Sequence, residues 1–364
     1  MSVKLIKPRF YYDEVHFDVE LERVFNENWL FGCLTSEIPQ KNDYYLFELG
    51  KHSVIIFNNG KEIVALQNMC SHRFNRIFTQ TKGNSLIICP FHSWGFDGCG
   101  VIRNKQIANT DDLIKQLSLK RYQVEIIGQF IFFHFSQTPS QSLLEQLHGL
   151  DEELILVSEI LNTKIHEEDN YHKVNWKFIC ENVMDKTHCT SLHNDSLVKI
   201  GYCIQPEDEV MQFGNNSSFV LPPIQDKERE KRDKFLNKHF PRKIQSNKYK
   251  HSFYFPNLTI GIYEGLNITI GNVLPISAMK TNYKLVYFNT KIDKTSDFTN
   301  NLLDAMSQEV ISFGTKVFEE DKVVLEHVQK GVMEAEHSGY VYENEIRIKW
   351  FYQAYHKYIK DGKF

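Results

Sequence analysis

Two short pairs of cysteine and histidine stand close together in the first quarter of the chain and have the side chains to hold a metal centre. One residue separates Cys70 from His72, two separate Cys89 from His92, and sixteen lie between the pairs. A [2Fe–2S] cluster with mixed ligation needs two thiolates on one iron and two imidazoles on the other. Structural zinc also binds two cysteines and two histidines, but two to four residues usually separate its paired ligands. The spacing favours the cluster and leaves zinc as the alternative.

A second group of ionisable residues falls within thirteen residues near the middle of the chain. Glu181, Asp185 and His188 stand at positions i, i+4 and i+7, so a helix there presents them on one face. Asn182 lies beside that face, and His193 follows near the expected end of the helix. Buried ionisable groups need a partner or a metal, whereas an exposed helix with scattered polar residues is the alternative. The apolar neighbours that favour burial are Trp176, Phe178, Ile179, Val183 and Met184.

The first group of residues resembles the cluster motif of Rieske proteins. The resemblance lies in the runs Cys70–Arg73 and Cys89–Trp94, with Pro and Trp around the second pair matching as well. Two positions depart from the motif, because Phe74 and Ser93 stand where the family commonly has glycine. Neither replaces a ligand, so the departures concern backbone hydrogen bonding around the sulfurs. The resemblance implies that the four cysteines and histidines bind a [2Fe–2S] cluster.

The run Asn182–His193 resembles the mononuclear-iron motif of Rieske non-haem iron oxygenases, the aromatic-ring-hydroxylating oxygenase alpha-subunit family. The resemblance covers nearly the whole chain. It implies that His188, His193 and one distant carboxylate bind Fe(II) as a facial triad with positions open for O2. It also implies a head-to-tail homotrimer, in which Asp185 accepts a hydrogen bond from a cluster histidine of the next subunit and so carries electrons between subunits. Asn182 belongs to the same catalytic motif.

The third iron ligand has to be chosen among three consecutive acids on a long helix expected at 299–332. Asp321 is the one acid on the apolar stripe of that helix, whereas Glu319 and Glu320 turn towards neighbouring lysines or solvent. The family's late Glu-Asp pair, followed by Glu and Gln, looks similar and favours the same residue. Asp321 is therefore the predicted ligand, ahead of Glu320. The stripe consists of Phe313, Val317, Asp321, Val324 and Val328.

At 364 residues the chain is longer than one core usually covers, so we expect two domains. Residues 1–39 form an N-terminal helical segment that packs on the catalytic domain, with Asp18 as the helix N-cap. Residues 40–137 form an all-β Rieske domain, because short β-type runs alternate there with turn residues. These runs lie at 45–49, 53–57, 62–66, 86–89, 124–127 and 130–135.

Residues 138–364 form the expected catalytic domain that holds the mononuclear iron. Its class is α+β, a helix-grip fold in which helices pack on one side of an antiparallel sheet. Residues 200–250 are poorly patterned and highly charged, which predicts a variable insert or lid. A final helix is expected at 343–360, and strands at 252–255, 258–263, 267–270 and 283–288.

The composition of the chain indicates which partners to expect and in which compartment the protein works. The formal net charge is −4 and the basic residues form no stripe, so we expect no nucleic-acid partner. The sequence contains neither an apolar run long enough for a membrane span nor a signal peptide at its start. Seven cysteines, an odd number, need no disulfides in a reducing compartment. We therefore expect a cytoplasmic protein.

Together these features predict the terminal component of a Rieske oxygenase system, an oxidoreductase that hydroxylates or oxidatively demethylates a small organic substrate. O2 is the co-substrate, and electrons come from NAD(P)H through a separate reductase, with or without a ferredoxin, because the chain has no dinucleotide fingerprint. An aromatic-ring cis-dihydroxylating dioxygenase is the alternative. A Rieske electron-transfer protein without oxygenase activity is the alternative of another class. The aromatic residues, which suit a flat ring or a quaternary ammonium group, include Tyr254, Phe255, Tyr263, Phe288 and Phe313.

Overall fold

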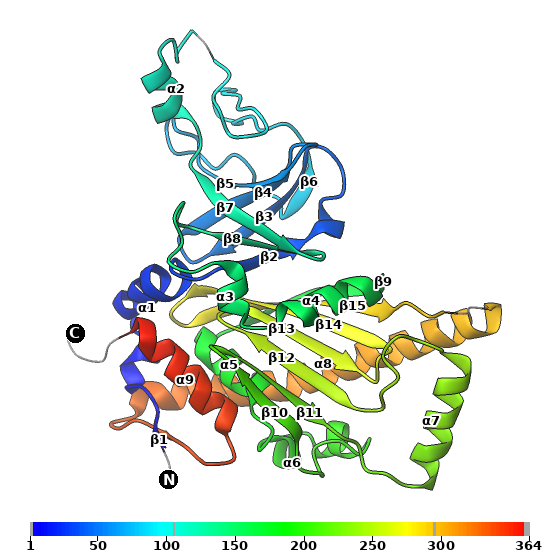
Figure 1. The fold of residues 1–364 in the computed structure, drawn as a ribbon. Helices are drawn as coiled ribbons and strands as arrows, with labels where there is room; N and C mark the ends of the chain where they lie inside the picture. The colour runs from blue at the N-terminus through cyan, green and yellow to red at the C-terminus, as the bar shows by residue number, and fades with distance from the viewer. Residues whose placement is uncertain (1–2, 105, 294–295, 360–364) are drawn as a thin grey trace. The chain divides into compact units, whose positions relative to one another are not determined.

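The computed structural model describes residues 3–104, 106–293 and 296–359. The chain divides into two compact units, each described by itself (Figure 1). The smaller unit contains residues 21–146 and 151–158, and the larger unit contains residues 1–20, 147–150 and 159–364. The expected N-terminal segment 1–39 is thus divided, because only its first twenty residues belong to the larger unit.

The smaller unit is built on one antiparallel sheet with the strand order β2-β8-β7-β5-β4-β3-β6. Alternating apolar residues bury one face of these strands around Ile55, Leu66 and Trp94. The helical elements of this unit are the π-turn 21–25, the 3₁₀-turn 35–37 and α2 (Asp111–Leu117), together with most of α3 (Leu143–Leu147) and α4 (Asp151–Ile160). The strands are β2 (Leu30–Leu34), β3 (Asp43–Leu49), β4 (His52–Asn58), β5 (Ile63–Gln67), β6 (Lys82–Asn84), β7 (Arg121–Ile127) and β8 (Phe130–His134).

The strand expected at 86–89 is wrong. The edge strand β6 ends at Asn84, and the next residues make only an isolated bridge between Ile88 and Gly95. Ile87 is buried, but Leu86 and Ile88 are half exposed on the surface. A β-branched run predicts a strand only if a neighbouring strand pairs with it, and here the chain leaves the sheet edge to form a loop.

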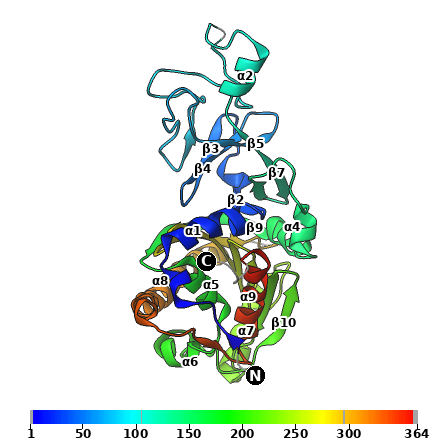
Figure 2. The ribbon, with the colours of Figure 1, turned by 90° about the vertical axis from the view of Figure 1, so that its left-hand side faces the viewer.

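The larger unit contains a seven-stranded antiparallel sheet with the order β10-β11-β12-β13-β14-β15-β9. The helices α5 (Trp176–Met184), α8 (Asp297–Glu334) and α9 (Ile346–Tyr358) contact this sheet, which confirms the α+β class (Figure 2). The strands are β9 (Leu161–His172), β10 (Asp208–Phe213), β11 (Asn216–Leu221), β12 (Tyr249–Tyr254), β13 (Leu258–Tyr263), β14 (Asn267–Ser277) and β15 (Lys280–Thr290).

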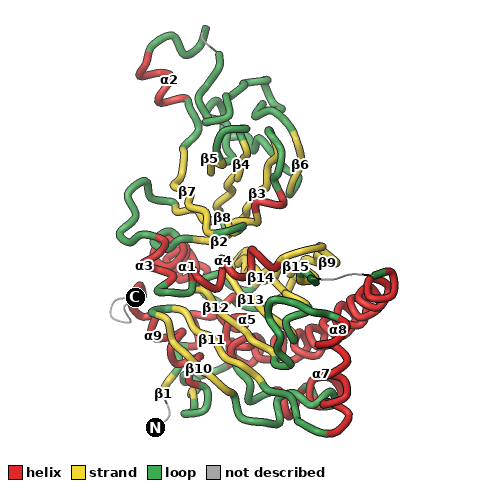
Figure 3. Tube along the Cα trace, turned by 45° about the vertical axis from the view of Figure 1, so that its right-hand side comes forward, coloured by secondary structure: helices red, strands yellow, loops and turns green. Residues whose placement is uncertain are grey.

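Shorter elements complete the larger unit. The 38-residue α8 is its longest helix and crosses beside the strands (Figure 3). The entering helix is α1 (Glu14–Glu20), so Asp18 lies inside it and is not its N-cap. The other elements are β1 (Val3–Lys4), the 3₁₀-turn 8–11, α6 (Cys189–Leu192), the π-turn 194–198, α7 (Lys227–His239) and β16 (Tyr340–Val341). Within the described ranges, no helix is long and apolar enough to cross a membrane.

Residues 200–250 differ from the expected solvated insert, because they supply two strands of the sheet as well as a charged helix. Strands β10 and β11 form a hairpin, and β11 pairs with β12. Helix α7 begins after Asp226, whose carboxylate accepts a hydrogen bond from the Arg229 backbone N–H at 2.8 Å. These strands bury polar residues such as Ser217 and Ser218, so their sequences lack the apolar alternation from which strands are predicted.

A buried ion pair joins three helices of the larger unit. Lys177 Nζ on α5 lies 2.6 Å from Glu20 Oε1 on α1, and both side chains are fully buried. The same carboxylate accepts hydrogen bonds from Trp176 Nε1 at 2.8 Å and from the Tyr355 hydroxyl on α9 at 2.6 Å. Burial acts to raise the pKa of Glu20, but Lys177 and His16 outweigh it and lower that pKa to about 2.

Replacing Lys177 by methionine is expected to destabilise the protein by about 3–5 kcal/mol at neutral pH, because Glu20 would stay buried without its partner. The depressed pKa of Glu20 also stabilises the wild type above the ordinary carboxyl pKa, and this contribution is lost as pH falls towards about 2. Urea unfolding at pH 7 measures the first effect. The exposed Lys173 provides the control K173M, which should unfold like wild type; equal stability of K177M would contradict the expectation.

Candidate active site

The prediction of one helix from Glu181 through His188 is wrong, because α5 ends at Met184 and Asp185 is its C-cap. This residue has extended backbone angles, and its carboxylate accepts hydrogen bonds from the Thr187 N–H at 2.6 Å and hydroxyl at 2.7 Å. Such a local side-chain bond competes with the helix and ends it. The chain then turns and begins the short helix α6 one residue after His188.

Because the helix ends there, Glu181 does not line the cavity with Asp185, His188 and His193. Its carboxylate accepts hydrogen bonds from the hydroxyl of Tyr11 at 3.0 Å and from the hydroxyl of Tyr352. Burial raises the pKa of Glu181 to about 7, although the two tyrosines act to lower it. Glu181 therefore belongs to a buried contact among α5, α9 and the N-terminal turn, not to the candidate site.

The three predicted iron ligands come together. One ligand atom each of His188, His193 and Asp321 lies within 4.8 Å of the other two. Asp321 Oδ1 is 3.0 Å from His193 Nε2 and 3.6 Å from His188 Nε2. Asp321 reaches the loop from α8 and is 5% exposed, and His193 is 1% exposed. Two imidazoles and one carboxylate converge at this point, as the sequence predicted.

The outer partners of the histidines fix which nitrogen carries the proton. His188 Nδ1 lies 2.9 Å from Asp185 Oδ2, and His193 Nδ1 lies 2.8 Å from Glu320 Oε2. A carboxylate only accepts, so each Nδ1–H donates and each Nε2 presents a lone pair. Both lone pairs face Asp321 Oδ1, which is buried and accepts no hydrogen bond from a described residue. Three converging lone pairs with oriented outer partners fit a bound cation.

The charges around His193 also favour a cation. Burial lowers the pKa of His193, but Asp321 and Glu320 outweigh it and the net shift is upward. At Asp185, burial raises the pKa, but the hydrogen bonds from His188 and Thr187 outweigh it and keep this carboxyl ionised. The set of two imidazoles and one carboxylate is the donor set of non-haem Fe(II) sites with open positions.

Glu320 is a site residue that the sequence did not predict. It was expected to turn towards lysines or solvent, and its Oε1 does lie 3.9 Å from Lys316 Nζ. Its Oε2, however, accepts hydrogen bonds from His193 and from the Ser196 hydroxyl at 2.6 Å. The side chain of a glutamate next to Asp321 is long enough to reach the far side of the His193 ring. The acid adjacent to the predicted ligand was therefore the sequence feature that could have indicated this partner.

Replacing Glu320 by alanine is expected to weaken metal binding at the site by about 10- to 100-fold, because His193 loses the partner that orients it. Titration of the metal-free protein with Fe(II) under anaerobic conditions measures this affinity. E319A, which alters the exposed neighbour on the same helix, is the matched control. Unchanged affinity in E320A would show that Glu320 does not orient the ligand.

The two cysteine–histidine pairs also come together, in the smaller unit. Cys70 and Cys89 are buried, at 1% and 2% exposure, and their thiols lie close enough to interact. His72 and His92 are exposed, and their ring centroids are 4.7 Å apart. Buried thiols beside exposed imidazoles fit a cluster whose sulfur-bound iron lies inside and whose imidazole-bound iron lies near the surface.

Both departures from the cluster motif lie where the backbone is left-handed. Phe74 has φ = 62° and Ser93 has φ = 56°. The turns nevertheless close, because the Phe74 N–H donates to the Cys70 carbonyl at 2.9 Å and the Ser93 N–H donates to the Cys89 carbonyl at 3.0 Å. Glycine adopts this conformation without strain, whereas other residues lose roughly 1–2 kcal/mol each. The two turns thus retain the geometry that glycine usually supplies.

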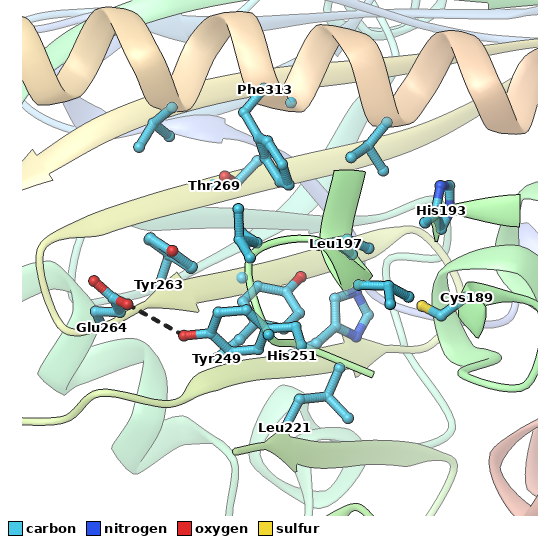
Figure 4. Close-up of a pocket in the computed structure, with 18 of the residues that line it drawn as sticks. Cys189, His193, Leu197, Leu221, Tyr249, His251, Tyr263, Glu264, Thr269 and Phe313 are labelled. Atoms are coloured by element: carbon cyan, nitrogen blue, oxygen red, sulfur yellow. Dashed lines mark hydrogen bonds between the residues drawn. The ribbon is translucent and has the colours of Figure 1, made fainter. Parts of the chain in front are cut away.

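A cavity of about 930 Å³ in the larger unit reaches the converging ligands (Figure 4). Its lining includes Asn182, Asp185, His188, His193 and Asp321. Among the five aromatic residues named from the sequence, Tyr263 and Phe313 line it, whereas Tyr254, Phe255 and Phe288 do not line it and are buried in the fold. Alternation along the strands turns Tyr249 and Tyr287 to the cavity instead. The aromatic lining that the sequence missed is Tyr202, Phe219, Tyr249, Tyr283, Tyr287 and Phe318.

Two family profiles match the chain and together span most of it. The Rieske [2Fe-2S] domain matches residues 28–122. The catalytic domain of the ring hydroxylating alpha subunit matches residues 160–361, which is more than half of the chain.

Individual relatives agree with these profiles. The carnitine monooxygenase oxygenase subunit of Escherichia coli (strain K12) is 27% identical over 357 residues, covering 92% of this chain and 86% of the relative. The glycine betaine monooxygenase oxygenase subunit of Pseudomonas aeruginosa is 27% identical over 201 residues, covering 54% of this chain but only 46% of the relative. This match therefore spans about half the length of the relative.

The fold also has counterparts among solved structures. The crystal structure of a quaternary ammonium Rieske monooxygenase in complex with L-carnitine matches with a TM-score of 0.77 at 20% identity, covering 98% of this chain and 96% of that chain. At this identity the similarity establishes a shared fold.

Proposed function

Because this chain belongs to the Rieske non-haem iron oxygenase alpha-subunit family, we propose that it is the terminal oxygenase of a multicomponent system. It uses O2 and electrons from a separate reductase to hydroxylate or oxidatively demethylate a small organic substrate. Its cofactors are a [2Fe–2S] cluster and mononuclear Fe(II). In this proposal Cys70, His72, Cys89 and His92 hold the cluster, and His188, His193 and Asp321 hold the Fe(II).

One observation carries the proposal: ligand atoms of two imidazoles and one carboxylate lie within 4.8 Å of one another at a cavity large enough for a small substrate. Ligand cavities in proteins usually enclose about 300–1,000 Å³. When bound, Fe(II) on two imidazoles and a carboxylate supplies open positions for O2, and the cluster supplies electrons.

The side chains around the metal position orient its ligands. Asp185 holds the Nδ1–H of His188, and Glu320 holds the Nδ1–H of His193, so that both Nε2 atoms face Asp321. The aromatic side chains that line the cavity limit the water around a bound substrate. Asn182 lines the same cavity beside Asp185 and contributes to substrate positioning.

Asp185 has a second role in the proposed electron path. Its two oxygens accept from His188 and Thr187, and an ionised carboxylate has about four acceptor positions. Its side chain is 14% exposed, so an imidazole N–H of a cluster ligand from the next subunit has an acceptor to bind. The proposal therefore includes a homotrimer in which electrons pass from one subunit to the next through Asp185.

The relatives favour a substrate with a quaternary ammonium group, because their names specify carnitine and glycine betaine. Aromatic rings line the cavity, and cation–π contact with such rings attracts quaternary ammonium groups. None of the seven cysteines forms a disulfide in the described structure, which suits the reducing cytoplasm that we propose as the compartment.

Oxygen uptake tests this function. Iron-replete protein with NADH and a surrogate reductase should consume O2 in the presence of a suitable substrate and release an aldehyde when an N-methyl group is removed. The substrates to compare are glycine betaine, L-carnitine, choline, benzoate and naphthalene. A dihydrodiol product from a ring substrate would establish the dihydroxylating alternative, and no uptake with any oxidisable compound would contradict oxygenase activity.

A further inference from the structure

A buried arginine stands behind the cavity wall, and the residues that the structure describes offer it no carboxylate partner. Arg347 on α9 is 3% exposed, and its Nε donates to the Ser217 hydroxyl at 3.0 Å while Nη2 donates to the Ser217 carbonyl at 3.2 Å. In the described part of the chain, no carboxylate lies within 4.0 Å of its guanidinium. Glu207, whose charge reaches it from farther away, pairs with Lys186 Nζ at 3.3 Å. Burial lowers the pKa of Arg347 to about 9, so the group is charged at neutral pH.

His251 on β12 connects this charge to the cavity. Its Nδ1 lies 3.3 Å and 3.2 Å from the Nη1 and Nη2 atoms of Arg347. Arginine only donates, so Nδ1 accepts and the ring proton resides on Nε2. Burial and the charge of Arg347 lower the pKa of His251 well below its usual value, which keeps the ring neutral. The tautomer of His251 is therefore fixed as Nε2–H.

The Nε2–H of His251 is a donor for which the described residues provide no acceptor. The residue is 5% exposed, lines the cavity, and its Nε2 has no hydrogen-bond partner among the described residues (Figure 4). On the sheet, its neighbours across the strands are Phe219 on one side and Gly261 on the other. Phe219 stacks on the imidazole with ring centroids 5.6 Å apart. Gly261 has no side chain, and the ring of Tyr249 packs over it, since a Cβ there would lie 3.0 Å from the Tyr249 hydroxyl.

The other arginines at the cavity do not offer the same site. Arg229 and Arg232 on α7 line it, but both pair with the buried carboxylate of Glu264, Arg232 at 2.7 Å. Their charge is thus compensated within the protein. A buried charge normally requires a partner, and Arg347 has only uncharged ones among the described residues, which include the Phe219 ring, whose centroid lies 4.5 Å from its guanidinium carbon.

We propose that the Nε2–H of His251, backed by the charge of Arg347, binds a carboxylate of the substrate, so that the substrates of this oxygenase are carboxylic acids. This inference rests on the proposed function and specifies its substrate class. A carboxylate supplies both the acceptor that His251 lacks and the negative charge that Arg347 lacks, whereas a hydroxyl or carbonyl group supplies only the acceptor. Arg347 acts through His251 as a positioning residue.

Two pairs of compounds test the inference by calorimetric binding to the iron-replete resting protein. Glycine betaine and choline share a trimethylammonium group, benzoate and benzyl alcohol share a ring, and each pair differs by carboxylate against hydroxyl. Wild type should bind the acid of at least one pair about 10- to 100-fold more tightly than its alcohol. H251L should lose that preference, whereas H251Q, which keeps an N–H near the Nε2 position, should retain most of it.

Further variants distinguish a specific role in carboxylate binding from a general disturbance of the cavity. R347M should reduce the preference for the acid while leaving the affinity for the alcohol unchanged. S252A alters the next residue of the strand, whose buried hydroxyl has no partner in the described chain, and should behave like wild type. Equal binding of acid and alcohol by wild type, an unchanged preference in H251L, or failure of both acids to bind would overturn the inference. Iron content and O2 uptake test the proposed function separately, because binding needs no turnover.

Discussion

Replacing Asp321 by alanine is expected to remove the mononuclear iron while leaving the [2Fe–2S] cluster in place. Asp321 supplies the only carboxylate oxygen in the described triad and stands 3.0 Å from His193 Nε2 and 3.6 Å from His188 Nε2. Two imidazoles alone bind Fe(II) weakly, so iron should fall from about three to about two atoms per chain. Turnover should fall at least about 1,000-fold, since O2 then has no metal to bind. Iron analysis and O2 uptake measure the two effects.

The control for this variant is D304A, which removes an exposed aspartate from the same helix. It should keep its iron and its activity. The visible spectrum of D321A should still show the oxidised cluster, because the cluster residues belong to the other unit. Full iron content in D321A would exclude Asp321 as a ligand, and a ligand role for the neighbouring Glu320 would then be tested by the same analysis.

Replacing Asp185 by asparagine is expected to preserve both metal centres and to lower turnover by at least about 100-fold. The amide oxygen can still accept a hydrogen bond from His188 Nδ1–H, so the ligand keeps its place. The negative charge, however, is lost, and with it the charge-assisted bond proposed towards the cluster histidine of the next subunit. Rapid-mixing experiments that follow reoxidation of the reduced cluster by O2 with substrate measure the electron transfer directly.

D195N changes an exposed aspartate in the same region and should transfer electrons at the wild-type rate. Two results would separate the roles of Asp185. Loss of the mononuclear iron from D185N would mean that the residue mainly holds His188. Near-normal turnover with both centres present would remove Asp185 from the electron path.

Much of the fold was predictable from sequence patterns, and the failures have physical causes. Strands such as β13, which was expected at its observed bounds, alternate or bury apolar residues and pair with neighbours on both sides. Strand β9 was not predicted, because it forms the sheet edge and carries many charged residues. Strand β11 was not predicted, because buried serines and an asparagine stand where a buried strand usually has apolar residues. Buried polar residues and charged edge residues both obscure the apolar pattern from which a strand is predicted.

The candidate site was predictable to the extent that it depends on local motifs. Spacing and resemblance predicted the two histidines, and resemblance with an expected apolar stripe predicted Asp321. The structure brings all three together, although Val324 and Val328 of that stripe are each 41% exposed. The break of α5 at Asp185 was not predictable from helix periodicity, because a side-chain hydrogen bond ends the helix. His251 had no motif around it. Its significance depends on Arg347, which is 96 residues away in the chain and adjacent only in the fold.

Iron and acid-labile sulfide per chain, measured on anaerobically purified protein, test the central claim most directly. Visible and electron-spin spectra before and after dithionite complete the measurement. The proposed oxygenase contains about three irons and about two sulfides per chain and shows a Rieske-type spectrum. A colourless protein that contains zinc, or one that holds two irons and binds no more when Fe(II) is added, would contradict the account.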